Sequence, residues 1–142
     1  MHVSNSKHGF SIVELMIVLV ITGVLAAVAV PIYQKNVESA KRTEAIAGIS
    51  LVKESLEIYY GTNGQYPTAP AFLKVVGKGW NELAKGDLTG QYFVGKNYKY
   101  RCTDGVNYEI MCLKNNILEF NVVLDWAGNW DFDDDQDVDP EA

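Results

Sequence analysis

A single carboxylate, Glu14, lies near the start of an otherwise apolar stretch that runs from residue 9 to residue 31. An ionised acid in hydrocarbon costs about 2.5–3.5 kcal/mol, so an acid at this position indicates a function and a cationic partner. The nearest candidate cation is the α-amino group that cleavage between Gly9 and Phe10 would create. Within one helix the two groups would approach each other only loosely, whereas the amine of one chain could meet the carboxylate of a neighbouring copy. The pattern therefore indicates a charge pair that sets the register between copies packed side by side.

The residues around this acid form a motif. A short polar leader ends in Gly9, and then come Phe10, Ser11, Ile12 and Val13, with Glu14 before the long apolar run. This segment resembles the N-terminus of type IV pilins and of the related pseudopilins. The resemblance implies that a membrane-embedded prepilin peptidase cuts the chain after Gly9 and N-methylates Phe10.

Two residues weaken the later part of the apolar helix. Gly23 costs a helix about 1 kcal/mol relative to alanine, and Pro31 removes a backbone donor and crowds the preceding turn. In pilins the matching positions bracket a stretch that can unwind in the assembled filament, so the resemblance implies extensibility between Gly23 and Pro31. The residue types alone allow a simple kink equally well.

Other kinds of apolar segment fit less well. Lys7 before the run and the small residues at 27–29 are typical of a general secretory signal. However, the run of about 20 apolar residues exceeds the roughly 7–15 of a usual signal core, and cleavage would fall next to Pro31. An uncleaved membrane anchor fits the length but leaves Glu14 unexplained. A buried core helix would hide too many apolar residues for a domain of this size.

Composition limits the classes of function. The 142 residues suffice for one domain with a core, and the net charge of −6, made more negative by loss of Lys7 with the leader, disfavours a nucleic-acid partner. Basic and tyrosine side chains alternate at residues 96–101, a pattern that could bind a single strand but is also ordinary protection of an edge strand. His2 and His8 both lie in the leader, so the mature chain has no histidine for a catalytic triad or a zinc site. We therefore do not expect an enzyme.

Periodicity divides the chain into four segments. Residues that are apolar on nearly all faces predict a membrane-spanning helix, and apolar residues at helical spacing predict its amphipathic continuation. The fold class is α+β, with the long N-terminal helical stalk packed on a small antiparallel β-sheet head, which is the ladle fold implied by the resemblance to pilins. The segments are a cleaved leader at residues 1–9, a transmembrane and assembly helix at 10–33, the amphipathic half of the stalk at 34–60, and a globular head with an acidic tail at 61–142.

Short runs of aromatic and β-branched residues predict the strands of the head. Gly61 and the residues that follow it should end the stalk, and residues 67–90 should form an irregular connection with a short helix near residues 80–84. The predicted strands are residues 92–94, 98–101, 108–113 and 117–124.

Cys102 and Cys112 present two exclusive alternatives. Two cysteines in an extracytoplasmic domain usually pair, and many pilins carry one disulfide near the C-terminus. A tight hairpin about Asp104 and Gly105 would instead place Cys102 opposite Tyr108, with Cys112 roughly 13 Å further along the strand at about 3.3 Å per residue. A disulfide requires Cα atoms within about 7 Å, so the hairpin and the bridge exclude each other. On compartment grounds we favour the disulfide, which requires a wider loop.

The C-terminal segment is rich in aspartate. Alternating carboxylates such as Asp131, Asp133 and Asp135 are hard-oxygen ligands of the kind that calcium requires. The spacing is not that of an EF-hand, because the glycine and glutamate positions of that loop are not matched. The alternative is a solvated tail, so calcium is possible and no other cofactor is expected.

The expected function is structural. The resemblance implies a pilin subunit that stays in the bacterial inner membrane until inner-membrane assembly machinery extracts it into a helical homo-oligomer, an extracellular type IV pilus. Within the same family, a pseudopilin of a type II secretion system is the alternative. A different class is a membrane-tethered module whose acidic tail binds calcium or another ligand.

Overall fold

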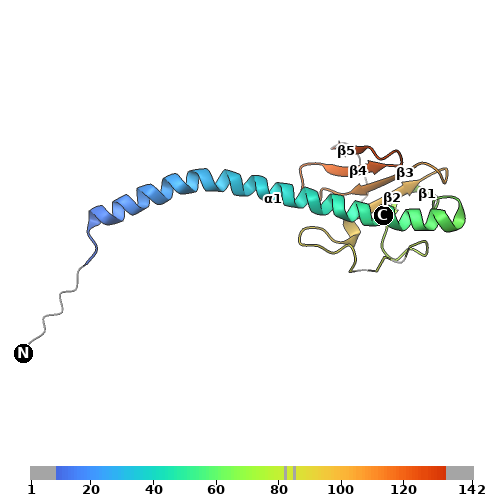
Figure 1. Ribbon diagram of the computed structural model, residues 1–142, viewed down its shortest axis with the longest axis horizontal. Coiled ribbons are helices and arrows are strands. Elements are labelled where there is room, and N and C mark those ends of the chain that lie inside the picture. Colours follow the sequence, from blue (N-terminus) through green and yellow to red (C-terminus); the bar gives the residue numbers. More distant parts are fainter. Residues whose placement is uncertain (1–8, 82, 85, 134–142) are drawn as a thin grey trace, which may run out of the picture. The chain divides into compact units, whose positions relative to one another are not determined.

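The computed structural model describes residues 9–81, 83–84 and 86–133, and the chain divides into two compact units, residues 1–37 and 38–142. One helix, α1, covers Ile12–Asn63 and contributes residues to both units. All five strands belong to the second unit, where they form an antiparallel sheet beside the C-terminal part of α1 (Figure 1). The predicted α+β fold, a long N-terminal helix with a small antiparallel sheet packed on it, is confirmed.

The C-terminus of α1 is fixed by a glycine. The helix ends at Asn63, and Gly64 follows with a φ of +72°, a left-handed conformation that suits glycine. The Gly64 N–H donates to the Tyr60 carbonyl at 2.8 Å, closing the last turn. Gly61, expected from the sequence to begin the stop, is instead part of the helix, because one glycine in a helix interior costs only about 1 kcal/mol.

The sheet follows chain order, so each strand pairs with the next one in sequence. A 3₁₀ turn, Gly95–Asn97, leads directly into the second strand. The strands are β1 Ala69–Lys74, β2 Tyr98–Cys102, β3 Tyr108–Cys112, β4 Asn121–Asp125 and β5 Trp130–Asp133.

Both edge strands were missed by the sequence prediction. β1 lies in the segment expected to be irregular. Its Pro70 lacks a backbone N–H, but an edge strand tolerates this because one of its sides forms no hydrogen bonds to a neighbouring strand. β5 lies in the segment expected to be an acidic tail. Conversely, residues 92–94 form no strand, and residues 80, 81, 83 and 84, the described part of the expected short helix, are not helical.

The basic and tyrosine residues at 96–101 do not protect an edge. β2 pairs with β1 on one side and with β3 on the other, so it lies inside the sheet. Lys99 on this strand is fully buried. The edge-strand interpretation of this pattern is therefore wrong.

The core forms between one face of α1 and one face of the sheet. The helix buries Ala45, Gly48, Ile49, Val52 and Leu56 at spacings of three and four residues. A Cβ atom on Gly48 would lie 2.2 Å from the ring of Tyr98, so glycine is required for this close approach. The sheet contributes alternate residues of its inner strands, and its core-facing side chains are Tyr98, Tyr100, Cys102, Tyr108, Ile110, Cys112, Val122 and Leu124.

The structure contains the tight hairpin and not the predicted disulfide. Cys102 pairs with Tyr108 and Tyr98 pairs with Cys112, and both cysteines are free. The Asp104 carboxylate accepts the backbone N–H groups of Val106 at 2.9 Å and Asn107 at 2.7 Å, and these bonds lower the pKa of Asp104 to about 2. This turn sets the register, and the register separates the cysteines. The expectation of a Cys102–Cys112 bridge is therefore wrong.

A carboxylate on α1 holds the loop before β2. Glu44 accepts three consecutive backbone N–H groups, from Gln91 at 3.1 Å, Tyr92 at 2.9 Å and Phe93 at 2.7 Å. A Cβ atom on Gly90 would lie 2.3 Å from the carboxylate, so the loop approaches closely because residue 90 is glycine. These contacts explain why residues 92–94 are not a strand, since two of their N–H groups are used by the helix.

Replacing this carboxylate should destabilise the second unit. Glu44→Ala removes the acceptor of three N–H groups, and we expect the free energy of unfolding to fall by about 2–4 kcal/mol. Glu44→Gln keeps one acceptor oxygen and should lose less. Denaturant unfolding followed by far-UV circular dichroism measures the change. The exposed Glu54 on the same helix is a matched control, because Glu54→Ala should change stability by no more than about 0.5 kcal/mol; equal losses at positions 44 and 54 would contradict the proposed anchoring.

Candidate functional site

The expected cleavage point lies outside the helix. Gly9, Phe10 and Ser11 have no regular secondary structure, and α1 begins at Ile12. Phe10 is 80% exposed, and nothing in the described part of the chain lies within 4 Å of where a Gly9 Cβ would be. The peptide bond between Gly9 and Phe10 therefore lies outside the helix and is exposed.

Glu14 folds back onto the start of its own helix. Its Oε2 atom accepts the backbone N–H of Ser11 at 3.0 Å, while the Ser11 hydroxyl accepts the N–H of Val13 at 3.3 Å. The Ser11 carbonyl accepts the N–H of Leu15 at 3.2 Å, so Ser11 occupies the N-cap position. Together the serine and glutamate form a capping box in which the glutamate accepts the N–H of the N-cap residue, while the serine hydroxyl accepts the N–H of the second helical residue, Val13, in place of the third.

This capping role was missed by the sequence analysis, although a signal for it was present. A serine followed three residues later by glutamate, directly before an apolar run, is the sequence signature of a capping box. The carboxylate also lies at the positive end of the helix dipole, where an acidic side chain stabilises the start of a helix. Glu14 thus has a structural partner within its own chain in addition to any partner in another chain.

The capping box leaves one carboxylate atom available. Within the part of the chain that the structure describes, Oε2 is engaged by Ser11 and no bond to Oε1 is present. Cleavage at Gly9 would create an amine on Phe10, the residue next to the bonded N–H. The carboxylate is therefore held close to the new terminus of its own chain with its second oxygen open to another donor.

The first part of α1 is apolar on all sides, and no other element of the described residues covers it. In the described residues one helix, α1, is long and apolar enough to cross a membrane, with a window of mean hydropathy 2.8 that is 0% buried. The hydroxyl of Thr22 is satisfied internally by the Val18 carbonyl at 2.8 Å. Apolar surface of this extent must be covered by lipid or by other copies of the helix.

The residues predicted to mark an extensible stretch lie within continuous helix. α1 passes through Gly23 and Pro31 without a break. A Cβ atom on Gly23 would meet nothing within 4 Å, so packing within the described chain does not require glycine there. Unwinding between these two residues in a filament remains a prediction.

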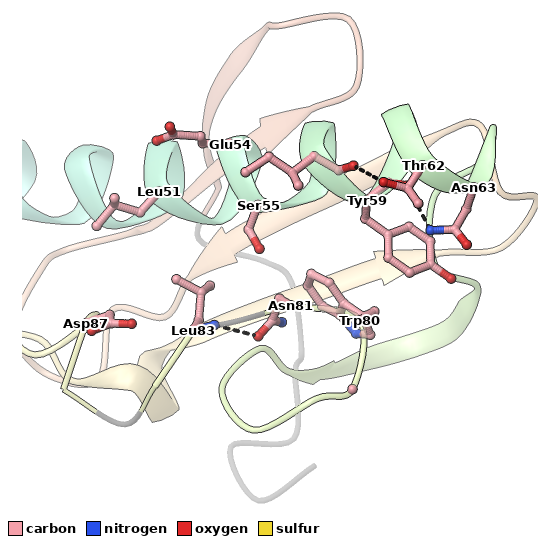
Figure 2. Close-up of a pocket in the computed structure, with 12 residues that line it drawn as sticks. Leu51, Glu54, Ser55, Tyr59, Thr62, Asn63, Trp80, Asn81, Leu83 and Asp87 are labelled. Carbon is pink, nitrogen blue, oxygen red and sulfur yellow. Dashed lines mark hydrogen bonds between the residues drawn. The ribbon is translucent and has the colours of Figure 1, made fainter.

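A hollow in the second unit is a weaker candidate. It has a volume of about 570 Å³ and lies between α1 and residues 79–81, 83 and 87, with Trp80 and Tyr59 at one end (Figure 2). Two of its polar side chains already serve the loop, because Asn81 accepts the Leu83 N–H at 3.1 Å and Asp87 accepts the Ala84 N–H at 2.8 Å. The side chains of Glu54, Ser55 and Tyr59 on α1 also line the hollow, but they form no metal-ligating group among the described residues.

The proposed calcium ligands are only partly described. Asp131 lies on β5, is exposed, and accepts the adjacent Phe132 N–H at 2.8 Å. The backbone of Asp133 ends the same strand, and Asp135 lies outside the described residues. Among the residues from 9 to 133 that the structure describes, no three acidic, cysteine or histidine side chains are grouped so as to hold a metal ion. Calcium binding by the tail stays a prediction.

Comparison with known proteins identifies the N-terminal segment. Residues 4–30 match the protein family described as the prokaryotic N-terminal methylation motif. The chain is 37% identical to type II secretion system core protein G of Pectobacterium carotovorum subsp. carotovorum, over 49% of the chain and 45% of that protein. It is 37% identical to core protein G of Escherichia coli (strain K12), over 48% of the chain and 47% of that protein. It is also 43% identical to a fimbrial protein of Neisseria meningitidis serogroup A, over 44% of the chain and 36% of that protein. The match therefore spans about half the length of these core proteins G and less of the fimbrial protein.

The capping box can be tested by amide hydrogen exchange on the full chain in detergent. Ser11→Ala removes the acceptor of the Val13 N–H, and a lost cap costs about 1 kcal/mol, so we expect exchange at residue 13 to rise about fivefold. Ser50→Ala is the matched control, because the Ser50 hydroxyl donates to the Ile46 carbonyl within the helix and caps nothing. Unchanged exchange at residue 13 in the Ser11 variant would rule out the cap.

Proposed function

We propose that this protein is the structural subunit of a type IV pilus filament. The proposal is supported by the match of residues 4–30 to the N-terminal methylation motif and by the similarity of about half of the chain to a fimbrial protein and to secretion core proteins G. The leader would be removed after Gly9 by a prepilin peptidase, and Phe10 would be N-methylated. The subunit would wait in the bacterial inner membrane and then be moved by inner-membrane assembly machinery into an extracellular filament. The role is structural, with no chemical reaction assigned to the chain.

The observation that supports polymerisation most directly is the exposed apolar part of α1. Its side chains from Ile12 to Tyr33 face outward with no covering element in the described chain. In the membrane, lipid covers them; in a filament, the same surface of neighbouring helices would cover them. Because lipid tails are as apolar as the helix, the hydrophobic effect does not favour one environment, and close packing and polar contacts must select the partner.

Glu14 supplies the polar contact that could select the partner. It is the one acidic residue in the apolar part of α1, and its Oε2 is engaged by the cap of its own helix. The open oxygen could accept a hydrogen bond from the methylated amine of a neighbouring Phe10. This contact would pair two opposite charges that would otherwise each be isolated in an apolar environment. Copies displaced along the helix axis would lose this pairing, so the charge pair would set the axial register of the polymer.

A pseudopilin of a type II secretion system is the second candidate. Several of the relatives, including those from Pectobacterium and Escherichia coli, are named core protein G of that system. The fimbrial relative in Neisseria meningitidis supports the pilus instead. Both candidates require the same processing and helix packing, and they differ in the machinery that the subunit serves.

A membrane-tethered ligand-binding module makes a different prediction. In that case α1 would serve only as an anchor, and the processed protein would remain monomeric in the membrane. Chemical cross-linking of the native membrane, followed by sedimentation, separates a ladder of homo-oligomers from a single monomeric species.

The processing is tested by the N-terminal residue and intact mass of the protein recovered from its native membrane. We expect the chain to start at Phe10 and to carry the mass of one additional methyl group. A start at Val30 would indicate a general secretory signal, and an intact Met1 would indicate an ordinary anchor; either result would overturn the proposed processing.

Two substitutions at position 14 separate the cap from the charge pair. Glu14→Gln keeps an oxygen that can accept the Ser11 N–H but removes the negative charge, whereas Glu14→Ala removes both. We expect both variants to insert in the membrane and both to fail to form filaments, as measured by electron microscopy and by sheared-filament yield. Normal filaments from Glu14→Gln would show that capping, and not charge pairing, is what assembly requires.

A further inference from the structure

The two cysteines lie at opposite ends of one hairpin on the same face. Cys102 is the last residue of β2 and Cys112 the last residue of β3, and they pair with Tyr108 and Tyr98 respectively. Four residues of β3 separate Cys112 from the position opposite Cys102, which is roughly 13 Å at about 3.3 Å per residue. A disulfide needs Cα atoms within about 7 Å, so the native register prevents the bond.

The core also shields both thiols from reagents. Cys102 is 1% exposed and Cys112 is 0% exposed, and both belong to the cluster that packs beneath α1. Burial raises the pKa of Cys112 to about 12, so this thiol stays protonated. Since the thiolate is the reactive form, the folded protein presents neither access nor a nucleophile at this position.

A disulfide would require a different hairpin. Moving β3 by four residues would place Cys112 opposite Cys102, and because the shift is even, each side chain would keep its face of the sheet. Tyr108 and Ile110, which are both buried, would then leave the core for a widened loop. Lys114 and Asn116 would take up the positions opposite Tyr100 and Tyr98. The tight turn at Asp104 would also be lost, together with the bond from the Tyr66 N–H to the Gly105 carbonyl at 2.8 Å.

We propose that Cys102 and Cys112 are a thiol-oxidation site that is open only while the sheet is unfolded, and that the disulfide and the native sheet exclude each other. In the unfolded chain the nine residues between the cysteines form a short, flexible loop that closes readily. The oxidant would be a disulfide, either that of a thiol oxidoreductase or oxidised glutathione. One cysteine attacks it to form a mixed disulfide, and the second displaces the reduced thiol. The chain gives up two electrons and two protons, and the oxidant becomes two thiols.

The consequence is an order of events. A chain that folds first keeps two reduced, buried thiols, even in an oxidising compartment. A chain that is oxidised first cannot pair β2 with β3 in the native register, and it therefore cannot complete the surface that covers α1. Such a chain would need a reductant before it could fold. This behaviour is independent of whether the protein forms filaments.

The test uses the full chain in mild detergent. As isolated, it should carry two thiols that react with a maleimide at least about a hundredfold more slowly than they do in guanidinium chloride. The chain is then unfolded, oxidised with oxidised glutathione to the intramolecular disulfide, checked by a mass loss of two hydrogens, and returned to native buffer. We expect amide protection at residues 98–102 and 108–112 to be absent, and to return when dithiothreitol is added.

Two controls separate register from oxidation itself. Wild-type protein taken through the same cycle in dithiothreitol should regain full protection without any substitution. The variant Arg101→Cys/Glu109→Cys, made with Cys102→Ala and Cys112→Ala, bridges positions that face each other in the native register, and it should refold while oxidised. Native protection in the oxidised wild-type chain, or a Cys102–Cys112 disulfide in folded protein taken from cells, would overturn the proposal.

Discussion

The packing of α1 on the tyrosine-bearing face of the sheet is the interaction on which the second unit depends. A sheet of five short strands with one bare apolar face is marginal in water, and each aliphatic side chain that α1 buries contributes about 1.5–3 kcal/mol. The fit is specific, because Gly48 allows the ring of Tyr98 to lie directly against the helix backbone. Glu44 adds a polar anchor on the same helix by holding the N–H groups of residues 91–93. Helix and sheet therefore stabilise each other, and the loop residues Val75, Leu88 and Phe93 complete the same buried core.

One helix thus meets two different environments. In the second unit α1 is amphipathic and buries Ile49, Val52 and Leu56 against its own sheet. In the first unit it is apolar on every side, so its surface must be covered by lipid or by other helices. The single acid of that part, Glu14, lies at the helix start, where the capping box and the helix dipole reduce the cost of its charge. A carboxylate held in this way can be kept in an apolar segment and still present one oxygen to a partner.

The turn between β2 and β3 determines whether the two cysteines on these strands can form a disulfide. Asp104 and Gly105 form a tight turn whose hydrogen bonds set the pairing of every residue in both strands. Because side chains alternate between faces, this pairing brings three tyrosines and both cysteines to the helix side of the sheet. Cysteines in oxidising compartments usually pair, but this is a statistical tendency. Strand register is a geometric constraint, and here it holds the two cysteines too far apart to form a disulfide.

The sequence by itself determined the motif around Gly9 and Glu14, the apolar character of the first helical segment, the α+β class and the three inner strands. These follow from local properties: residue type, periodicity and turn residues. It also contained the capping-box signature of Ser11 and Glu14, but this role was recognised only from the hydrogen bonds in the structure. Tertiary structure alone decided the rest. Pro70 weakens the local signal for β1, and aspartates weaken it for β5, so both edge strands form because an existing sheet edge offers them hydrogen bonds. Residues 92–94 have strand-like side chains, yet Glu44, about fifty residues earlier in the chain, accepts the N–H groups of Tyr92 and Phe93. The state of the two cysteines was decided in the same way, because the distance between them depends on the register of a hairpin and not on their spacing in the sequence.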